Sequence, residues 1–225
     1  MVLTHDEKLR YLDRRDGSNK YIPNKHLNDG SYLSVDFKMN SCDVLLAGTL
    51  GTMVKIFDMR KPRGAPWIRR NGRTNYVKSI SEHHVLAAGM GQGNEAHGDM
   101  SVYDLRFLRQ NDLAGVNDPL VRFPAHEYMQ GAACAVQLDR GIVAVHEHTR
   151  MKLYSLRSGR RITCPAIDKF APGCTISGAV WATMPNEQNP SLFVAARNAI
   201  SKFSFGNNFD EDVFATSEPT RSRKG

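Results

Sequence analysis

The sequence predicts an all-β fold built from repeated antiparallel sheets, and three observations carry that prediction. A short phrase recurs, in which an aromatic or aliphatic residue is followed by Asp, one further residue and Arg. Alternating and continuously apolar runs precede each copy, as β-strands require. The copies are about 45 to 51 residues apart, a spacing typical of propeller blades rather than of helical hairpins. We therefore expect a partial β-propeller.

The second repeat shows the expected strands most clearly. Residues 32–37 alternate, residues 44–48 form a continuous apolar run, and residues 53–57 alternate again. These predict the first three strands of one blade, here termed a, b and c in chain order. A fully apolar strand b implies burial on both faces, as expected where one blade packs on the next. Similar b runs occur at residues 85–88, 142–145 and 192–196.

The repeat spacing also divides the chain. We expect a propeller over residues 1–206, with a part-blade at 1–28 and about four blades at 29–72, 73–126, 127–168 and 169–206. A flexible basic tail, residues 207–225, would follow. A closed ring of this type has about seven blades, so we expect an incomplete ring with exposed strand edges. Truncation, or pairing with another chain, would account for the missing blades.

The repeat phrase resembles the end of strand c in the WD40 repeat family. Its copies are Leu12-Asp13-Arg14-Arg15, Phe57-Asp58-Met59-Arg60, Tyr103-Asp104-Leu105-Arg106, Tyr154-Ser155-Leu156-Arg157 and the faded Phe203-Ser204-Phe205. The resemblance covers residues 2–206. It departs from the family in that Leu, Phe or Tyr replaces Trp, and Ala125-His126 alone resembles the family's Gly-His pair.

Composition bounds the function. Hydrophobic residues make up 41% and charged residues 24%, which fits a chain with a packed core. No apolar run approaches the ~20 residues of a membrane span. The four cysteines lack Cys-x-x-Cys spacing, so we expect buried, reduced thiols and a nuclear or cytoplasmic location. They are Cys42, Cys134, Cys164 and Cys174.

The formal net charge of +7 favours an acidic partner. Basic residues cluster at residues 14–15, 61–73, 157–161 and 221–224. Three interpretations stay open: solvated turn charges, an acidic protein surface, or nucleic acid. Nucleic acid is the least favoured, because no aromatic platform is interleaved with the basic groups.

The Arg of each phrase should lie at the turn after strand c, on one rim of the propeller. This pattern resembles that of WD40 substrate receptors of cullin-4 RING ubiquitin ligases, where such arginines help dock a propeller adaptor. Further landmarks are Arg122, Ala125-His126-Glu127-Tyr128, Gly141-Ile142-Val143-Ala144-Val145, Leu153-Tyr154-Ser155-Leu156-Arg157 and Leu192-Phe193-Val194-Ala195-Ala196. With these, residues 121–205 resemble the cullin-4-associated factor 4-like group, also called WD-repeat protein 21-like. The resemblance implies an adaptor site at Asp13, Arg15, Asp58, Arg60, Asp104, Arg106 and Arg157. The alternative is that Asp-x-Arg only closes the turn, with Asp bonding local backbone amides.

Two loops on the opposite rim are candidates for binding a client protein. Their residues are Gln92, Asn94, Glu95, His97, Tyr128 and Met129. The alternative is that these loops are tolerated insertions. We expect a monomer within a protein complex, with self-association of a fragment. A general scaffold in an RNA-processing or chromatin complex is the alternative function.

Enzymatic interpretations find little support, and we expect neither catalysis nor a cofactor. Gly89-x-Gly91-x-Gly93 lacks the Lys-Ser/Thr pair of a P-loop and instead predicts a long hairpin loop from Gly89 to Gly98. His146-Glu147-His148 could place two imidazoles on one strand face, but a third metal ligand is not apparent. We expect these histidines to be exposed in a turn. His83-His84 with His97 has the same weakness.

Overall fold

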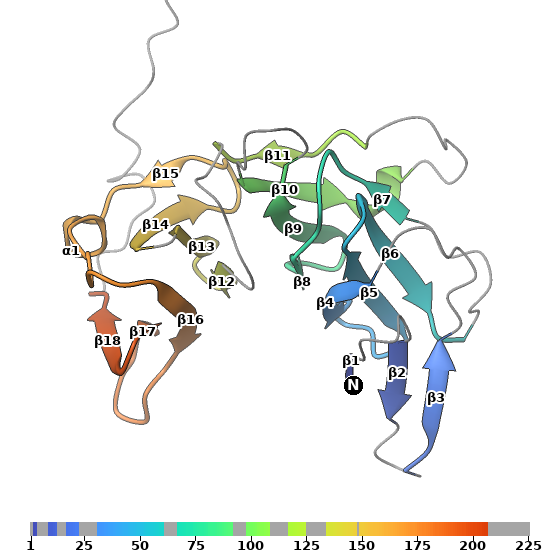
Figure 1. The fold of residues 1–225 in the computed structure, drawn as a ribbon, viewed down its shortest axis with the longest axis horizontal. Helices are drawn as coiled ribbons and strands as arrows, with labels where there is room; N and C mark the ends of the chain where they lie inside the picture. Colours follow the sequence, from blue (N-terminus) through green and yellow to red (C-terminus); the bar gives the residue numbers. More distant parts are fainter. Residues whose placement is uncertain are drawn as a thin grey trace, which may run out of the picture. The chain divides into compact units, whose positions relative to one another are not determined.

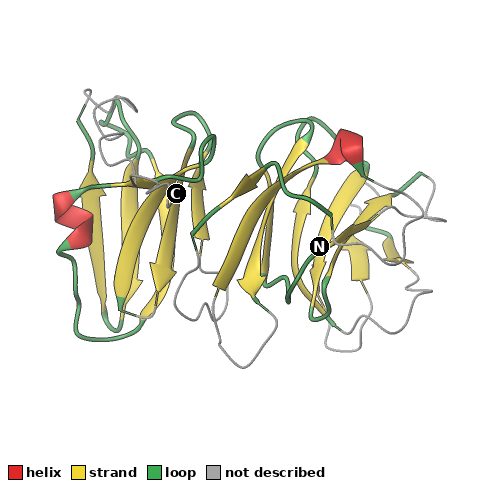
Figure 2. Cartoon of the chain, turned by 90° about the horizontal axis from the view of Figure 1, so that it is seen from above, coloured by secondary structure: helices red, strands yellow, loops and turns green. Residues whose placement is uncertain are grey.

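The computed structural model describes residues 2–3, 9–12, 17–22, 31–60, 67–91, 98–108, 117–124, 134–147 and 149–206. The chain divides into two compact units, residues 1–133 and 134–225. Strands dominate both units, and the helices of the described residues are the short η2 (Leu105–Phe107) and α1 (Pro165–Asp168) (Figure 2). None of these helices is long or apolar enough to cross a membrane.

The first unit holds three antiparallel sheets whose strands follow chain order (Figure 1). The first comprises β1 (Val2–Leu3), β2 (Leu9–Leu12) and β3 (Asn19–Ile22). The second comprises β4 (Tyr32–Phe37), β5 (Val44–Thr49), β6 (Met53–Asp58) and β7 (Trp67–Arg69). The third comprises β8 (Tyr76–Ser79), β9 (His84–Met90), β10 (Gly98–Asp104) and β11 (Val121–Arg122).

The second unit holds two further sheets of the same kind. One comprises β12 (Cys134–Gln137), β13 (Ile142–Glu147), β14 (Arg150–Ser155) and β15 (Arg161–Ile162). The other comprises β16 (Ile176–Ala182), β17 (Ser191–Ala196) and β18 (Ala199–Ser204). Repeated antiparallel meanders with almost no helix confirm the predicted fold class, an all-β, partial β-propeller. The a, b and c strands expected in the second repeat correspond to β4, β5 and β6.

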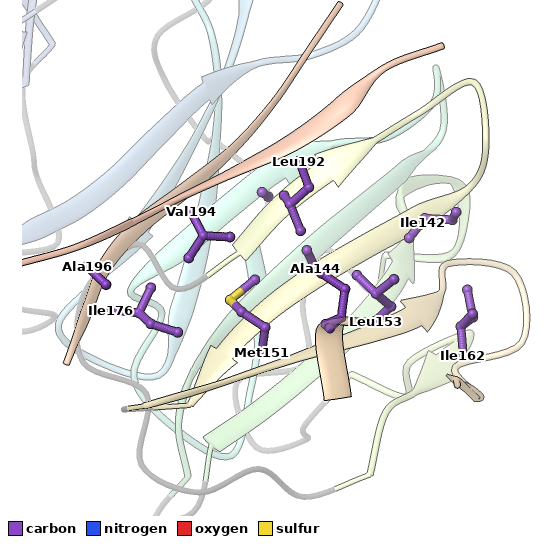
Figure 3. Packing of buried hydrophobic residues seen from close by; sticks show 11 residues of the cluster. Ile142, Ala144, Met151, Leu153, Ile162, Ile176, Leu192, Val194 and Ala196 are labelled. Atoms are coloured by element: carbon purple, nitrogen blue, oxygen red, sulfur yellow. The ribbon is translucent and has the colours of Figure 1, made fainter. Parts of the chain in front are cut away.

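Strand b is buried on both faces, as its apolar run predicts. Leu45 and Leu46 point to opposite faces of β5, and both are fully buried. Leu45 packs with Leu9 of the first sheet, whereas Leu46 packs with Val85 of the third. A third cluster fills the space between the two sheets of the second unit, where Met151 and Leu153 face Leu192 and Val194 (Figure 3).

The glycines of the β9–β10 hairpin allow backbones to approach closely. Gly89 belongs to β9 and pairs with Asp99. Strand β9 therefore extends into the segment that was expected to be a loop from Gly89 to Gly98. A Cβ added at Gly89 would lie 1.9 Å from the carbonyl oxygen of Arg73. Gly91 forms a β-bridge with Gly72. A Cβ added at Gly72 would lie 1.9 Å from the Met90 carbonyl oxygen. These positions require glycine because backbone occupies the space of a side chain.

Arg70 is a buried cation within the first unit. Its side chain has no exposed surface, and its Nη2 lies 3.1 Å from Asp99 Oδ2. Nη2 also donates to the Asp99 carbonyl at 2.8 Å, while Nη1 donates to the Arg73 carbonyl at 3.1 Å and to Thr74 Oγ1 at 3.0 Å. Arg70 therefore joins the connection after β7 to strand β10. The interpretation of residues 61–73 as solvated turn charges is wrong for this residue.

The cysteine prediction is partly wrong. All four thiols are free, but burial applies only to Cys134. Cys42 is exposed, because it lies in the turn between β4 and β5 rather than in a strand. Cys164 and Cys174 are partly buried beside the core of the second unit.

Candidate protein-interaction site

The turn after β6 brings together Asp58 and Arg60 of the repeat phrase. Asp58 Oδ1 accepts from the Arg60 backbone N–H at 3.0 Å and from Arg60 Nε at 3.0 Å. Asp58 Oδ2 accepts from Arg60 Nη2 at 2.9 Å. The Arg60 guanidinium thus forms a bidentate, charge-assisted contact with the carboxylate two residues earlier, here termed the clamp.

The turn after β10 repeats this geometry with Asp104 and Arg106. Asp104 Oδ1 accepts from the Arg106 backbone N–H at 2.9 Å and from Nε at 3.0 Å. Asp104 Oδ2 accepts from Nη2 at 2.6 Å. The backbone contact caps η2. Both Asp-x-Arg turns are therefore closed locally, as one of the two interpretations of the phrase expects.

The clamp leaves both arginines at the surface. The Arg60 side chain is 65% exposed and the Arg106 side chain 55%. A guanidinium carries five N–H donors, and its own Asp occupies only one edge of the fork. The other edge, which includes Nη1, can donate to an acceptor on another molecule. Turn closure therefore does not prevent docking through these residues.

The carboxylates and guanidiniums stabilise each other's charged forms. The hydrogen bond from the Arg106 side chain holds the pKa of Asp104 well below its usual range, despite the burial of that carboxyl. The same contact raises the pKa of Arg106. Asp58 raises the pKa of Arg60 through an equivalent hydrogen bond. The Asp104–Arg106 pair is therefore ionised near neutral pH, and that turn presents a fixed ion pair.

His84 contacts the Asp104 carboxylate of the second turn, a contact that the sequence analysis does not predict. Its Nε2 lies 3.5 Å from Asp104 Oδ2, and its Nδ1 is 2.8 Å from Ser81 Oγ. Ser81 Oγ also accepts from the backbone N–H groups of His83 and His84, so it caps the turn between β8 and β9. Asp104 Oδ2 thus lies close to both Arg106 Nη2, at 2.6 Å, and His84 Nε2.

Helix η2 sets an aromatic ring beside the second arginine. Leu105 and Leu108 pack against the core of the first unit, because residues three apart lie on the same side of a 3₁₀ helix. Arg106 and Phe107 consequently face outward. Phe107 is 76% exposed, and the Arg106 guanidinium lies 5.6 Å from the centre of its ring. Arginine and exposed aromatic side chains are the types enriched at protein interfaces.

The remaining residues of the predicted adaptor site differ. Arg157 is exposed and has no ion pair within the described part of the chain. Ser155, which replaces Asp there, offers a hydroxyl that accepts from the Ser158 backbone at 3.4 Å. A hydroxyl cannot form the carboxylate clamp, so this turn lacks it. Asp13 and Arg15 lie outside the described residues.

The predicted client-binding residues belong to two segments that the structure does not describe. Gln92, Asn94, Glu95, His97, Tyr128 and Met129 all lie outside the described residues. The first four belong to the connection between β9 and β10, which pair at Met90 and Gly98. Gly98, which follows these four residues, begins β10, whereas Arg106 follows its other end.

The prediction of exposed turn histidines at residues 146–148 is wrong for the part that the structure describes. His146 is 6% and Glu147 1% exposed, because β13 continues through both and pairs with β14. Lys152 Nζ lies 2.6 Å from Glu147 Oε2 and compensates the buried charge. His148 lies outside the described residues, among which no group of His, Cys, Asp and Glu could hold a metal ion.

Comparisons with known proteins bear on the fold. No protein-family model and no curated protein matches the sequence. Among solved structures, the chain is similar to the computationally designed Ika4 protein, with a TM-score of 0.52, 12% identity, and 80% of this chain and 95% of Ika4 covered. The computationally designed Ika8 protein gives a TM-score of 0.56, 11% identity, and coverage of 84% of this chain and 50% of Ika8. The chain thus spans about half the length of Ika8. At these identities the likeness shows the fold alone.

Proposed function

We propose that the chain is a non-enzymatic scaffold of the WD40 type, and that it acts as a substrate receptor, or part of one, of a cullin-4 RING ubiquitin ligase. It docks on the ligase's propeller adaptor through its Asp-x-Arg turns. The observation that carries this proposal is the orientation of Arg60 and Arg106. Each is exposed at the end of strand c, yet each is held in one conformation by its own Asp.

Preorganisation is the physical reason why such a turn suits docking. A free arginine loses rotamer freedom when it binds, at a cost of ~0.5–1.5 kcal/mol per immobilised side chain. Arg60 and Arg106 are already ordered, so a partner's carbonyl or carboxylate meets a fixed donor. Phe107 adds apolar area beside the donors of Arg106.

Pull-down of the purified adaptor tests the proposal. Replacing both Arg60 and Arg106 by Ala should reduce capture by about tenfold or more, since hydrogen bonds to charged groups contribute ~1.5–3 kcal/mol each. The double Lys variant should fail similarly, because an ammonium cannot reproduce the fork. Arg122→Ala is the matched control, as this arginine is 67% exposed on the outer strand β11.

Two outcomes would contradict the proposal. Undiminished capture by the double Ala variant would exclude docking through these arginines. A wild-type chain that captures no adaptor would exclude the ligase altogether and favour a general scaffold in an RNA-processing or chromatin complex.

A further inference from the structure

The turn after β14 carries an exposed serine between two exposed arginines. It runs from Ser155 to Arg160, and Ser158 is exposed together with Arg157 and Arg160. Neither arginine side chain has a hydrogen-bond or ion-pair partner among the residues that the structure describes. The turn itself contains no carboxylate, because Ser155 stands where the complete copies of the phrase have Asp. This turn is therefore basic and lacks a clamp.

The backbone of the turn is well defined. The Ser155 N–H donates to the Arg160 carbonyl at 2.9 Å, and the Gly159 N–H donates to the Ser155 carbonyl at 2.9 Å. Gly159 has a φ of 71°, a left-handed conformation that favours glycine. These contacts fix the backbone position of Ser158 relative to Arg160.

Ser158 and Arg160 reproduce the backbone contact of the Asp-x-Arg turns. Ser158 Oγ accepts from the Arg160 N–H at 3.3 Å. In the two complete turns an Asp oxygen accepts from the N–H of the arginine two residues later, at 3.0 Å for Arg60 and at 2.9 Å for Arg106. The spacing, the backbone donor and the arginine are the same. What the serine turn lacks is an anion that would hold the guanidinium.

We propose that Ser158 is a phosphorylation site, and that its phosphate forms a third clamp with Arg160, of the kind that Asp58 and Asp104 form with their arginines. A phosphoserine supplies a negative charge of nearly two and three acceptor oxygens, and arginine binds phosphate through two parallel hydrogen bonds. Arg157 supplies a second guanidinium from the same turn. The inference goes beyond the proposed function, because neither the modification nor the clamp requires the adaptor.

The phosphoryl group comes from a nucleoside triphosphate through a protein kinase. Ser158 Oγ attacks the γ-phosphorus of ATP, the Oγ–P bond forms as the bond to ADP breaks, and the hydroxyl proton passes to the base of the kinase. The serine is exposed, and its contact with the Arg160 N–H at 3.3 Å is longer than the usual ~2.7–3.2 Å, so releasing the hydroxyl costs little. Arginines on both sides of the serine suit a kinase whose substrate groove is acidic.

Phosphorylation of the purified chain in vitro tests the site. The probe is the catalytic domain of protein kinase C, a kinase that selects basic residues beside its serine, with Mg²⁺ and ATP. Mass spectrometry of the folded chain should locate a phosphate on Ser158, and Ser158→Ala should remove that signal. A folded chain that carries no phosphate on Ser158 after this treatment would overturn the assignment of a modification site.

Phosphorus NMR tests the clamp, with phosphoserine introduced at residue 158 during translation so that no kinase is needed. The second pKa of a free phosphoserine is about 6, and a nearby guanidinium lowers it by favouring the dianion. The signal should therefore titrate about half a pH unit or more lower in the folded chain than in concentrated urea. Arg160→Ala should remove at least half of this difference. Arg122→Ala is the matched control, exposed on β11, and should leave the difference unchanged.

Other charged groups near the turn do not account for such a result. Arg161 on β15 is paired with Asp168 at 2.6 Å. The turn that contains Asp139 and Arg140 is joined to this one by a backbone hydrogen bond of 2.7 Å. Each of these arginines is matched by one carboxylate, and Arg160→Ala retains them all. Equal titration midpoints in the folded and unfolded chains, or a midpoint that Arg160→Ala does not move, would overturn the clamp.

Discussion

Replacing Arg70 by Met should destabilise the first unit by about 3 kcal/mol. The substitution keeps the apolar stem of the side chain but removes donors from the carbonyls of Arg73 and Asp99. Each stranded buried acceptor costs ~1–3 kcal/mol, and breaking a buried ion pair costs ~3–5 kcal/mol. The lower end applies, because the Asp99 side chain is 36% exposed and water can solvate it. Arg70 Nε, which is buried without a partner among the described residues, reduces the net loss further.

Urea unfolding followed by one tryptophan measures this loss in the first unit. In a Trp181→Phe background, Trp67 on β7 reports the first unit. At a slope of ~2 kcal/mol per molar urea, Arg70→Met should lower the midpoint by roughly 1–2 M. Arg122→Met is the matched control and should change stability by no more than ~0.5 kcal/mol, because Arg122 is exposed on β11. Equal midpoints for the two variants would refute the assignment of Arg70 as a buried tie between β10 and the chain after β7.

Two further predictions concern Asp104 and Gly89. The pKa of Asp104 is lowered, first by its hydrogen bond from the Arg106 side chain. Its ionised form therefore stabilises the fold above the unfolded pKa of about 3.9, and this contribution is lost as pH falls towards the folded value. In a His84→Gln background, which removes the imidazole facing Asp104, Asp104→Asn should lower the urea midpoint at pH 7, and the difference should narrow below about pH 4. A difference that stays constant down to pH 3 would rule this out. Gly89→Ala should destabilise the fold by ~1–3 kcal/mol through overpacking against the Arg73 backbone. Gly178→Ala is the control and should be nearly neutral, because a Cβ there meets nothing within 4 Å. Equal unfolding midpoints for the two alanine variants would contradict the close approach of the Gly89 and Arg73 backbones.

The strands were predictable because their signal is local. Residues 44–48 are continuously apolar, and a strand packed on both sides needs no other information. Leu45 and Leu46 confirm this, since each packs on a different neighbouring sheet. The closure of the Asp-x-Arg turns was also foreseeable, because Asp commonly bonds a backbone N–H two residues later. The bonding of each arginine side chain to the same carboxylate was not anticipated.

The errors share a different cause, which is that partners distant in sequence decide burial. Arg70 reads as one more charge in a basic stretch until Asp99 is placed beside it, 29 residues away. Glu147 reads as part of a turn because it follows an apolar run, but Lys152 across the hairpin compensates its charge. The contact between the rings of Trp181 and Phe205 was missed for the same reason. The two residues belong to separate segments that show no common pattern in the sequence.

The two interpretations of the Asp-x-Arg phrase use different atoms and therefore do not compete. Local closure uses the backbone N–H, Nε and Nη2 of the arginine, all of which donate to the Asp carboxylate, whereas docking would use the outer edge of the guanidinium, which includes Nη1. The outer edge of the guanidinium remains for a partner. Because its own carboxylate lies beside it, such an arginine attracts distant anions weakly and acts mainly through short-range hydrogen bonds. This favours a protein acceptor at contact distance over the phosphate backbone of a nucleic acid, whose binding depends on uncompensated charge. The turn that bears Arg157 has Ser155 in place of Asp, so that arginine has no carboxylate two residues before it, and its side chain lacks this local contact.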